Sequence, residues 1–301
     1  MNKLEELKIV MNALMQRYAE RVPDVKKILN DLIQEGVIRN ETEISNDHIA
    51  FRTMGVPHLG IASLEKIFLY YGYTKRDHYA FETKKLDAYW YAPPSDEFPR
   101  IFISELRVGD LSEEAQKIIY SYTNEVDSDP VDHLNLQDPQ AVGEFLHTSL
   151  WRIPTKSDYS RLLTESEYAA WVIYNRYYLN HYTISVHYLK EGFNTLSEFN
   201  AFLERNGIQL NDAGGKIKVS PDGLLLQSST VAQVIEASFA GGEKLNIAGS
   251  YVEFAERKLL PQFTVLSKTE IKREHLRDGF EANNADKIFE STFTSQISKS
   301  K

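Results

Sequence analysis

The chain of 301 residues contains no cysteine. Disulfide bonds, thiolate metal sites and cysteine nucleophiles are therefore excluded, and a bound metal must be held by histidine, aspartate or glutamate. Long apolar runs are absent as well, so no membrane partner is expected. Basic residues are outnumbered, with 34 lysines and arginines against 43 acidic residues and a net charge of −9. Because an acidic surface repels phosphate backbones, nucleic acid is not expected as a partner either.

Several compact enzyme motifs are also missing. The sequence has no GxSxG elbow, no Walker-type phosphate loop, no HExxH pair and no GxGxxG following a strand. The GGKIK stretch lacks the loop length and the following helix of a phosphate site. Near the N-terminus, Glu5 and Glu6 interrupt the apolar residues. This segment therefore predicts an amphipathic helix rather than a signal peptide, and the cytoplasm is the expected compartment.

Hydrophobic spacing divides a single expected catalytic domain into five stretches. Residues 1–40 have the spacing of two helices, separated at Pro23. Residues 45–110 predict a β-α-β-β unit, with room for a further strand near residues 79–83. Residues 111–178 form a helical insertion, and residues 261–301 form a C-terminal extension. This extension is polar from about residue 283, so it is expected to be partly tethered or frayed.

Residues 179–260 return to the texture of the first unit. The strand candidates are HYTISVHYL, KIKVSP, GLLLQSST, QVIEASFA and SYVEFAERK, and TLSEFNAFLERNG is a helix candidate. A β-α-β-β-β order is therefore expected twice, as a repeat of pattern rather than of identity. The fold class predicted from this order is α+β.

Strand alternation selects the residues that could do chemistry. Side chains two apart on a strand share a face, so His48 lies on one face with Arg52, and His181 lies on one face with Ser185. Two half-barrels closing on each other would bring His48, His181 and Glu253 to one point. Two imidazoles and one carboxylate leave coordination positions open, as suits ferrous iron that handles oxygen. The residues alone do not choose iron over manganese, cobalt, nickel or zinc.

Each of these residues also has an ordinary structural interpretation. A histidine that begins a strand is more often a surface residue or one with satisfied hydrogen bonds. Glu253 could pair with Arg257 or a neighbouring lysine, and Arg52 could belong to a solvated face. Glu105 follows two apolar residues on one strand face, which is costly unless the carboxylate is paired or bound to metal. The aromatic residues between positions 168 and 178 could form a partner surface, but their helical spacing favours the core.

Several longer phrases resemble the DUF1338 family of the vicinal oxygen chelate superfamily. The phrases are NDHIAFRT, RIFISEL, GGKIKVSPDGLLLQSSTVA, SYVEFAER and NNADKIFEST, and the resemblance runs from about residue 47 to residue 292. The family includes 2-oxoadipate dioxygenase/decarboxylase. The resemblance implies two βαβββ modules forming an open β-barrel around a metal, with the N-terminal helices and the helical insertion added to it.

The resemblance also implies roles for individual residues. His48, His181 and Glu253 match the family's metal ligands, and Arg52 matches its substrate-binding arginine, which we expect to orient the substrate during catalysis. Glu105 lies on the strand that supplies a fourth ligand in some relatives, so it is expected as a fourth ligand or base. Further candidates for contact with substrate, chosen from their strands, are Ser185, Gln227, Ser228 and Ser229.

The implied activity is that of an Fe(II)-dependent dioxygenase and decarboxylase of lysine degradation. It would convert a 2-oxo acid resembling 2-oxoadipate, with O₂, to a 2-hydroxy acid resembling 2-hydroxyglutarate and CO₂. Two alternatives remain open at this point. One is a glyoxalase-like lyase or isomerase that uses Zn²⁺ or Ni²⁺ as a Lewis acid, with Glu105 as base. The other is a non-catalytic protein of the same fold that binds a small molecule.

Overall fold

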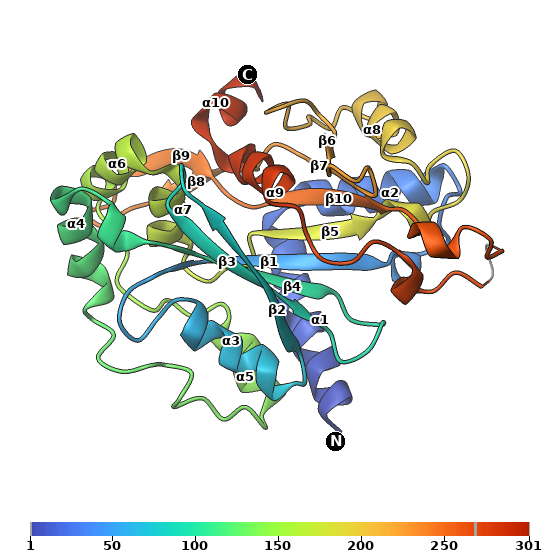
Figure 1. Cartoon of the computed structure of the whole chain (residues 1–301). Helices are drawn as coiled ribbons and strands as arrows, with labels where there is room; N and C mark the ends of the chain where they lie inside the picture. The colour runs from blue at the N-terminus through green and yellow to red at the C-terminus, as the bar shows by residue number, and fades with distance from the viewer. Residues whose placement is uncertain (1, 268–269, 301) are drawn as a thin grey trace.

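The computed structural model describes residues 2–267 and 270–300. The chain begins with two helices, α1 (Lys3–Arg21) and α2 (Pro23–Gln34), as its apolar spacing predicts. Pro23 begins the second helix, where its missing N–H would have no partner within the helix anyway. Figure 1 shows both helices, in blue, beside the central sheet. Within the described ranges, no helix is long and apolar enough to cross a membrane.

An eight-stranded sheet forms the centre, in the order β2-β3-β4-β1-β5-β10-β7-β6. The strands of the first half of the sheet, together with one helix, form the first module. It consists of β1 (Asn46–Met54), α3 (Ile61–Tyr70), β2 (Thr74–Phe81), β3 (Leu86–Ala92) and β4 (Arg100–Leu106). The second half of the sheet belongs in the same way to the second module, which consists of β5 (His181–Ser185), α8 (Leu196–Arg205), β6 (Lys218–Val219), β7 (Leu225–Ser229) and β10 (Tyr251–Arg257).

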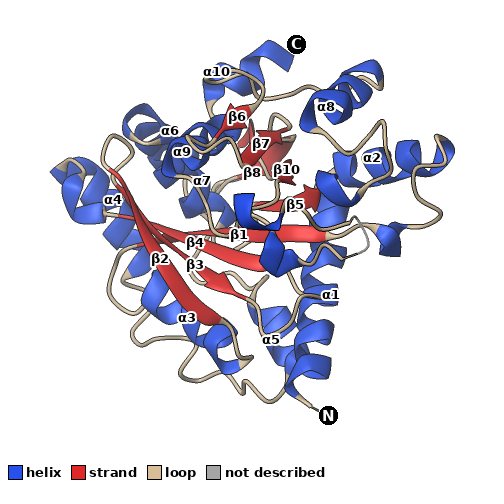
Figure 2. Ribbon diagram, turned by 45° about the vertical axis from the view of Figure 1, so that its right-hand side comes forward, coloured by secondary structure: helices blue, strands red, loops and turns tan. Residues whose placement is uncertain are grey.

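The two modules are built alike. In the first, β1 runs parallel to β4, and in the second, β5 runs parallel to β10. The antiparallel pair β1 and β5 joins the modules into one sheet. Figure 2 shows this sheet, in red, curling as it passes from β2 to β6. The predicted α+β class and the repeated βαβββ order are therefore confirmed.

Two of the predicted strands need correction. The segment QVIEASFA contains β8 (Val234–Ser238), which pairs only with β9 (Lys244–Ala248) in a separate two-stranded sheet outside the barrel. The segment HYTISVHYL leaves the sheet at Ser185, because a 3₁₀ turn, η3 (Val186–Tyr188), begins there. His187 therefore does not continue the strand face of His181.

The helical insertion contains α4 (Glu113–Thr123), α5 (Pro139–Phe145), α6 (Lys156–Glu165) and α7 (Glu167–Asn175). The side chains of Thr155 and Ser166 accept backbone N–H groups at the starts of α6 and α7. Tyr168 and Trp171 on α7 are buried, and the Trp171 Nε1 donates to the carbonyl of Gly249 at 2.8 Å. The core interpretation of this aromatic segment is therefore confirmed.

The C-terminal extension contains a structured helix, α9 (Ala282–Phe289), followed by the short α10 (Thr294–Ile297). Helix α9 contacts β2 of the first module and β6 and β7 of the second, so it bridges the two edges of the curled sheet. Figure 1 shows it in front of β10. Ile288 and Phe289 are buried there. The expectation of a frayed segment from residue 283 is wrong for α9, because its apolar side covers the inside of the barrel.

His187 provides a test of how the second module responds to acid. Its Nδ1 accepts the backbone N–H of Arg257 at 3.2 Å, and burial lowers the pKa of His187 to about 4. An unfolded histidine takes up a proton near pH 6.5, before the folded one does. The neutral ring therefore contributes its full stabilisation above pH 6.5. As the pH falls towards 4, the free energy of unfolding decreases by roughly 2 to 3 kcal/mol.

We expect His187→Asn to remove this part of the acid sensitivity. Urea unfolding of the metal-free protein at pH 7 and pH 4.5 measures it, with the exposed His133→Asn as the control. The drop in free energy of unfolding between the two pH values should be smaller by about 2 kcal/mol in His187→Asn only. An equal drop in both variants would show that His187 is not responsible.

Candidate metal centre

Three adjacent strands carry the predicted metal ligands. His48 lies on β1, His181 begins β5 and Glu253 lies in the middle of β10. The pairing of these strands places the three side chains together, with all three ligand atoms within 4.8 Å of one another. The Glu253 Oε2 lies 3.0 Å from the His181 Nε2 and 3.4 Å from the His48 Nε2. The two Nε2 atoms are themselves 3.4 Å apart.

These separations fit a shared metal ion. Ligand atoms bound about 2.1 Å from one ion, at octahedral or tetrahedral angles, lie roughly 3.0 to 3.4 Å from each other. The donor set supplies two imidazole nitrogens and one carboxylate oxygen, and all three side chains are buried. Buried groups of this kind are usually paired or bound to metal. The residues present therefore fit a mononuclear divalent metal site.

The outer nitrogen of each imidazole has its own partner, supplied by the preceding residue. The His48 Nδ1 lies 2.8 Å from Asp47 Oδ1, and the His181 Nδ1 lies 2.9 Å from Asn180 Oδ1. An Nδ1–H that donates outward leaves the Nε2 lone pair free for a metal. The carboxylate is oriented as well, because its Oε1 accepts from the Gln227 Nε2 at 2.7 Å.

The protonation of the cluster follows from burial and charge together. Burial favours a neutral carboxyl group, but the two imidazoles beside Glu253 hold its pKa well below the usual range. Burial lowers the pKa of His181, against the attraction of Glu253. Burial also disfavours charge on His48, yet Glu253 and Asp47 raise its pKa. The glutamate is therefore an anion that is ready to bind a cation.

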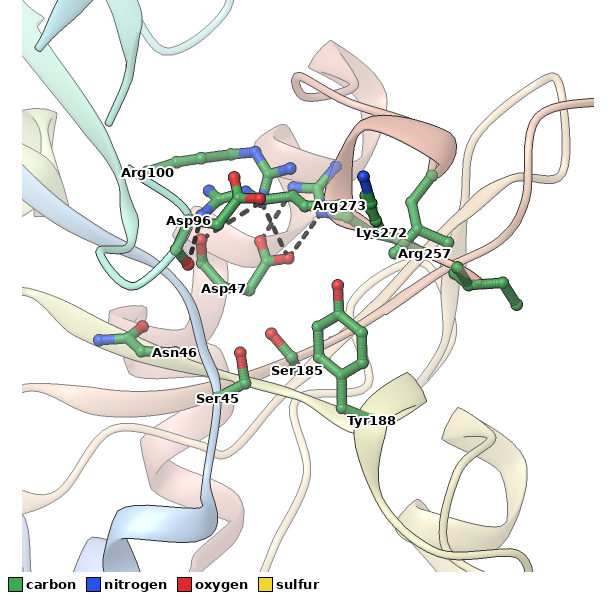
Figure 3. A pocket seen from close by; sticks show the side chains of 12 residues that line it. Ser45, Asn46, Asp47, Asp96, Arg100, Ser185, Tyr188, Arg257, Lys272 and Arg273 are labelled. Atoms are coloured by element: carbon green, nitrogen blue, oxygen red, sulfur yellow. Dashed lines mark hydrogen bonds and ion pairs between the residues drawn. The ribbon is translucent and has the colours of Figure 1, made fainter. Parts of the chain in front are cut away.

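A buried ion pair holds Asp47 in place behind His48. Arg257 donates to both carboxylate oxygens of Asp47, from Nε at 2.6 Å and from Nη2 at 2.9 Å. The Arg100 Nη1 lies 3.4 Å from the same carboxylate. Figure 3 shows these three side chains together. Because Arg257 pairs with Asp47, the interpretation that Arg257 pairs with Glu253 is wrong.

Arg52 lies four residues after His48, about 13 Å further along β1. It is fully buried, so the interpretation of a solvated face is wrong. Its Nη1 donates to Thr292 Oγ1 at 2.9 Å, and its Nη2 donates to the carbonyl of Phe289 at 3.1 Å. Its guanidinium lies 5.1 to 5.5 Å from the ring centres of three aromatic residues, Tyr168, Trp171 and Phe289.

The guanidinium of Arg52 has no carboxylate partner in the part of the chain that the structure describes, and its Nε there has no hydrogen-bond partner. A buried cation without an anion is costly, so natural proteins rarely keep one without a use. The arrangement fits an anionic ligand that would complete the charge balance. Burial lowers the pKa of Arg52, but an arginine stays protonated.

The ligand atoms face a small cavity, called the metal cavity below. Its volume is about 20 Å³, and it is lined by His48, Phe102, His181, Gln227, Tyr251, Glu253, Phe280, Ala285, Ile288 and Phe289. Phe280 packs edge-on against the His48 ring, with centres 4.7 Å apart, and Tyr251 covers the His181 ring at 4.8 Å. The space suits one ion or one water molecule, and its aromatic wall keeps other water out.

Comparison with known proteins identifies the family. A model of the 2-oxoadipate dioxygenase/decarboxylase family matches residues 10–268. This chain belongs to that family. A protein from Arabidopsis thaliana named 2-oxoadipate dioxygenase/decarboxylase, chloroplastic, is 44% identical over 96% of this chain and 78% of its own length. The resemblance found in the sequence phrases is therefore confirmed.

Solved structures share the architecture. The crystal structure of hydroxyglutarate synthase from Oryza sativa, in complex with 2-oxoadipate, is 43% identical to this chain. It superposes with a TM-score of 0.88 over 96% of this chain and 92% of that one. A glyoxalase superfamily protein from Ralstonia eutropha JMP134 is 20% identical, with a TM-score of 0.71 over 92% of this chain and 87% of that one. The second likeness concerns the fold alone.

The symmetry of the two modules shows why Glu105 is not brought to the metal cavity. In the second module, His181 pairs with Tyr251, and Glu253 lies two residues after Tyr251. In the first module, His48 pairs with Arg100, and the residue two positions after Arg100 is Phe102. Phe102 lines the metal cavity, whereas Glu105 lies on the opposite face of β4. The Glu105 Oε2 accepts the N–H of Ile61 at 2.8 Å, at the start of α3. The expectation that Glu105 is a fourth metal ligand is therefore wrong, because its carboxylate caps helix α3 instead.

The other candidates for substrate contact lie in different places. Gln227 lines the metal cavity, where it holds Glu253. The Ser228 hydroxyl donates to Asn200 on α8, on the opposite face of β7, and Ser229 pairs with the Ser291 hydroxyl at 2.8 Å. Ser185 lines a separate pocket beside Asp47. None of the three serines lines the metal cavity, so their predicted contact with substrate has no support in the structure.

Several residues at the centre were missed from the sequence. Asp47 and Asn180 each precede a ligand histidine, so the phrases DH and NH in matching places of the two modules were a readable signal. Asn284 on α9 donates to Gln227 Oε1 at 3.1 Å and thereby turns the amide nitrogen towards Glu253. No local pattern indicates Asn284 or Phe280, because both reach the centre only through the path of the C-terminal extension.

Proposed function

We propose that this protein is a metal-dependent 2-oxoadipate dioxygenase/decarboxylase, an oxidoreductase acting on a 2-oxo acid. The names of the relatives and the family model support the reaction class. The substrate loses C1 as CO₂ when the C1–C2 bond breaks. One oxygen atom of O₂ completes a carboxylate at C2, and the other becomes a hydroxyl group on C3. A six-carbon 2-oxo diacid thus yields a five-carbon 2-hydroxy diacid.

The observation that carries the proposal is the position of Arg52. The guanidinium is buried, has no carboxylate partner among residues 2–267 and 270–300, and lies in the same barrel as three converging ligand side chains. Its planar fork can bind a carboxylate through two parallel hydrogen bonds, and a buried site strengthens both bonds. We infer that Arg52 binds a carboxylate of the 2-oxo acid and thereby positions the keto group towards His48, His181 and Glu253.

The proposed metal is Fe(II), held by His48, His181 and Glu253. Two imidazoles and one carboxylate are the donor set of many oxygen-using iron enzymes. When bound, a ferrous ion supplies redox chemistry and open coordination positions. Zinc, nickel, cobalt and manganese suit the same donors, so a purified sample can hold one of them instead. Phe102, Phe280 and the rest of the aromatic wall would exclude water from the reacting atoms.

Substrate binding in this proposal requires α9 to move. A cavity of about 20 Å³ holds an ion or a water molecule, but not a six-carbon acid. The Phe289 carbonyl and the Thr292 hydroxyl now accept the two donors that a carboxylate would need. We expect the substrate carboxylate to replace both acceptors on Arg52. The side chains of Ile288 and Phe289, which line the cavity, would then shift outward.

Oxygen uptake by anaerobically Fe(II)-loaded protein tests the proposal. Protein with measured metal content is offered 2-oxoadipate and a panel of shorter and longer 2-oxo acids. We expect O₂ consumption that depends on a 2-oxo acid and matches CO₂ release one to one. No uptake with any member of the panel, at stoichiometric Fe(II), would contradict the proposal.

A glyoxalase-like lyase or isomerase is the competing function for this fold. It would need a second carboxylate as base at the metal, and the predicted residue, Glu105, caps α3 instead. A reaction that proceeds equally with and without O₂ would favour this alternative. The cytoplasmic location and the role in lysine degradation stay predictions.

A further inference from the structure

A second cavity, called the basic pocket here, lies beside Asp47. Its volume is about 270 Å³, and it shares no lining residue with the metal cavity. Figure 3 shows its side chains converging from the start of β1, the end of β5 and the segment after residue 270. Its central residues are Asn46, Asp47, Arg100, Ser185, Arg257 and Arg273. We propose that the basic pocket binds a small organic carboxylate, at a site separate from the metal centre.

Charge is the first reason. Four cationic side chains line the pocket, those of Arg100, Arg257, Lys272 and Arg273, against the two carboxylates of Asp47 and Asp96. Asp278, just outside the lining, also pairs with the Arg100 Nε at 2.6 Å, so the local excess is one positive charge, in a chain whose net charge is −9. Asp47 is already neutralised by Arg257 and Arg100, and Asp96 lies exposed at the rim. A positive cavity in an acidic protein concentrates anions from solution.

Polar groups without a partner are the second reason. Arg273 uses Nη1 to donate to the Phe98 carbonyl at 2.7 Å, but its buried Nη2 has no hydrogen-bond partner within residues 2–267 and 270–300. Over the same ranges, the Lys272 ammonium group has no carboxylate within 4.0 Å. The Asn46 Oδ1 is likewise buried without a partner. Buried polar atoms almost always have partners, so the Arg273 Nη2 and the Asn46 Oδ1 fit a ligand, and the exposed Lys272 adds positive charge beside them.

Hydroxyl groups complete the lining. Ser45, Ser185 and Tyr188 face the pocket, and their hydroxyls form no hydrogen bond with the described part of the chain. Figure 3 shows the hydroxyls of Ser45 and Ser185 on the side of the pocket opposite Arg100. A ligand with an anionic end and a second polar group would use both sides. Donor and acceptor groups on opposite walls therefore favour an organic acid over a simple ion.

The size and the guanidinium define the ligand class. A volume of about 270 Å³ is below the range of roughly 300 to 1,000 Å³ typical of sites for drug-sized ligands, so a nucleotide cofactor is too large. A guanidinium matches the plane and the two oxygens of a carboxylate. The pocket thus suits a short mono- or dicarboxylate, with its carboxylate on Arg273 and Lys272.

A ligand in the basic pocket would be linked to the metal centre through one residue, Asp47. Asp47 lines the basic pocket and also accepts from the His48 Nδ1. Arg257, which holds Asp47, donates to the carbonyls of Arg277 and Gly279 as well, directly before Phe280. An occupant of the pocket would therefore lie against the residues that position His48 and the cavity wall.

Calorimetric titration of the metal-loaded protein with glutarate tests the proposal at fixed ionic strength. Glutarate lacks a 2-oxo group, so the result does not depend on the proposed reaction. We expect glutarate affinity to fall about tenfold in Arg273→Gln, which removes one charge-assisted hydrogen bond. Lys272→Gln, at an exposed position that contributes little to folding, should weaken binding about threefold. Asp96→Asn should strengthen it, because a negative charge leaves the rim.

Arg52→Met is the matched control, because glutarate could also bind at the metal centre. The proposal predicts that one glutarate still binds in Arg52→Met with unchanged affinity. Affinity that is lost in Arg52→Met and unchanged in both Arg273→Gln and Lys272→Gln would overturn it, since binding would then occur at the metal centre alone. The absence of any binding heat with millimolar glutarate would overturn it too.

Discussion

Replacing His181 by alanine is expected to abolish both metal binding and turnover. Its Nε2 is one of three ligand atoms, and the Glu253 Oε2 lies only 3.0 Å from it. Loss of an outer hydrogen-bond partner alone typically weakens metal affinity by about 10- to 100-fold, so loss of a ligand should cost more than 100-fold. The fold should survive, because the change removes a buried polar ring from the start of β5 without breaking the strand pairing.

Metal analysis of anaerobically loaded and desalted protein measures this effect, alongside O₂ uptake with 2-oxoadipate. His133→Ala is the matched control, since His133 is exposed and hydrogen-bonds only with Ser128 in the described structure. His133→Ala should bind one metal per chain and keep its turnover. Stoichiometric, tightly bound metal in His181→Ala would show that the three side chains are not the ligand set.

Replacing Arg52 by methionine is expected to remove activity while leaving metal content and stability intact. A carboxylate held by two charge-assisted hydrogen bonds gains about 3 kcal/mol or more, so kcat/KM should fall at least about 100-fold. The free energy of unfolding should stay the same or rise. This follows because methionine fills similar space among Tyr168, Trp171 and Phe289 without a buried, unpaired charge.

Arg52→Lys separates charge from geometry. Lysine keeps the positive charge but loses the planar fork, so we expect kcat/KM to lie between those of the wild type and Arg52→Met. Steady-state kinetics, metal analysis and urea unfolding of the three proteins provide the comparison, with the exposed Arg161→Lys as control. Wild-type kinetics in Arg52→Met would eliminate Arg52 as the substrate-binding residue. A large loss of stability would instead indicate a structural role.

Replacing Arg257 and replacing Arg52 should have opposite effects on the free energy of unfolding, because the two buried arginines have different partners. Arg257 is bonded to both oxygens of Asp47, so its removal would leave a buried carboxylate unpaired and cost several kcal/mol. Among the described residues, Arg52 donates to neutral acceptors, the Thr292 hydroxyl and the Phe289 carbonyl. A charge kept at the expense of stability is a common sign of function. The comparison therefore supports the proposed role of Arg52 independently of any likeness to other proteins.

Much of the centre could be predicted from local rules. Alternation along a strand places His48 and Arg52 on one face, and the absence of cysteine restricts a metal to histidine and carboxylate ligands. The repeated βαβββ pattern and the family phrases locate the second histidine and Glu253. The prediction that Trp171 belongs to the core used the spacing of one helix, and the structure agrees with it.

Two of the errors, those for Glu105 and β8, occurred where the outcome depends on pairing between distant segments. Glu105 was expected near the metal because it lies on the corresponding strand. Strand register places Phe102 at the corresponding position, and Glu105 one face away. Register is a relation between two strands, so the residues of β4 alone do not contain it. The strand β8 was assigned to the barrel for the same reason.

The sequence by itself determined the kinds of ligand available, the two-module pattern, and which side chains share a strand face. These properties depend on residue type and on spacing within one element. Only the tertiary structure decided that three ligand atoms meet within 4.8 Å, that Asp47 and Asn180 orient the imidazoles, and that α9 closes the barrel. Those facts depend on strand register and on burial of the apolar side of α9, which arise only when segments far apart in the chain pack together.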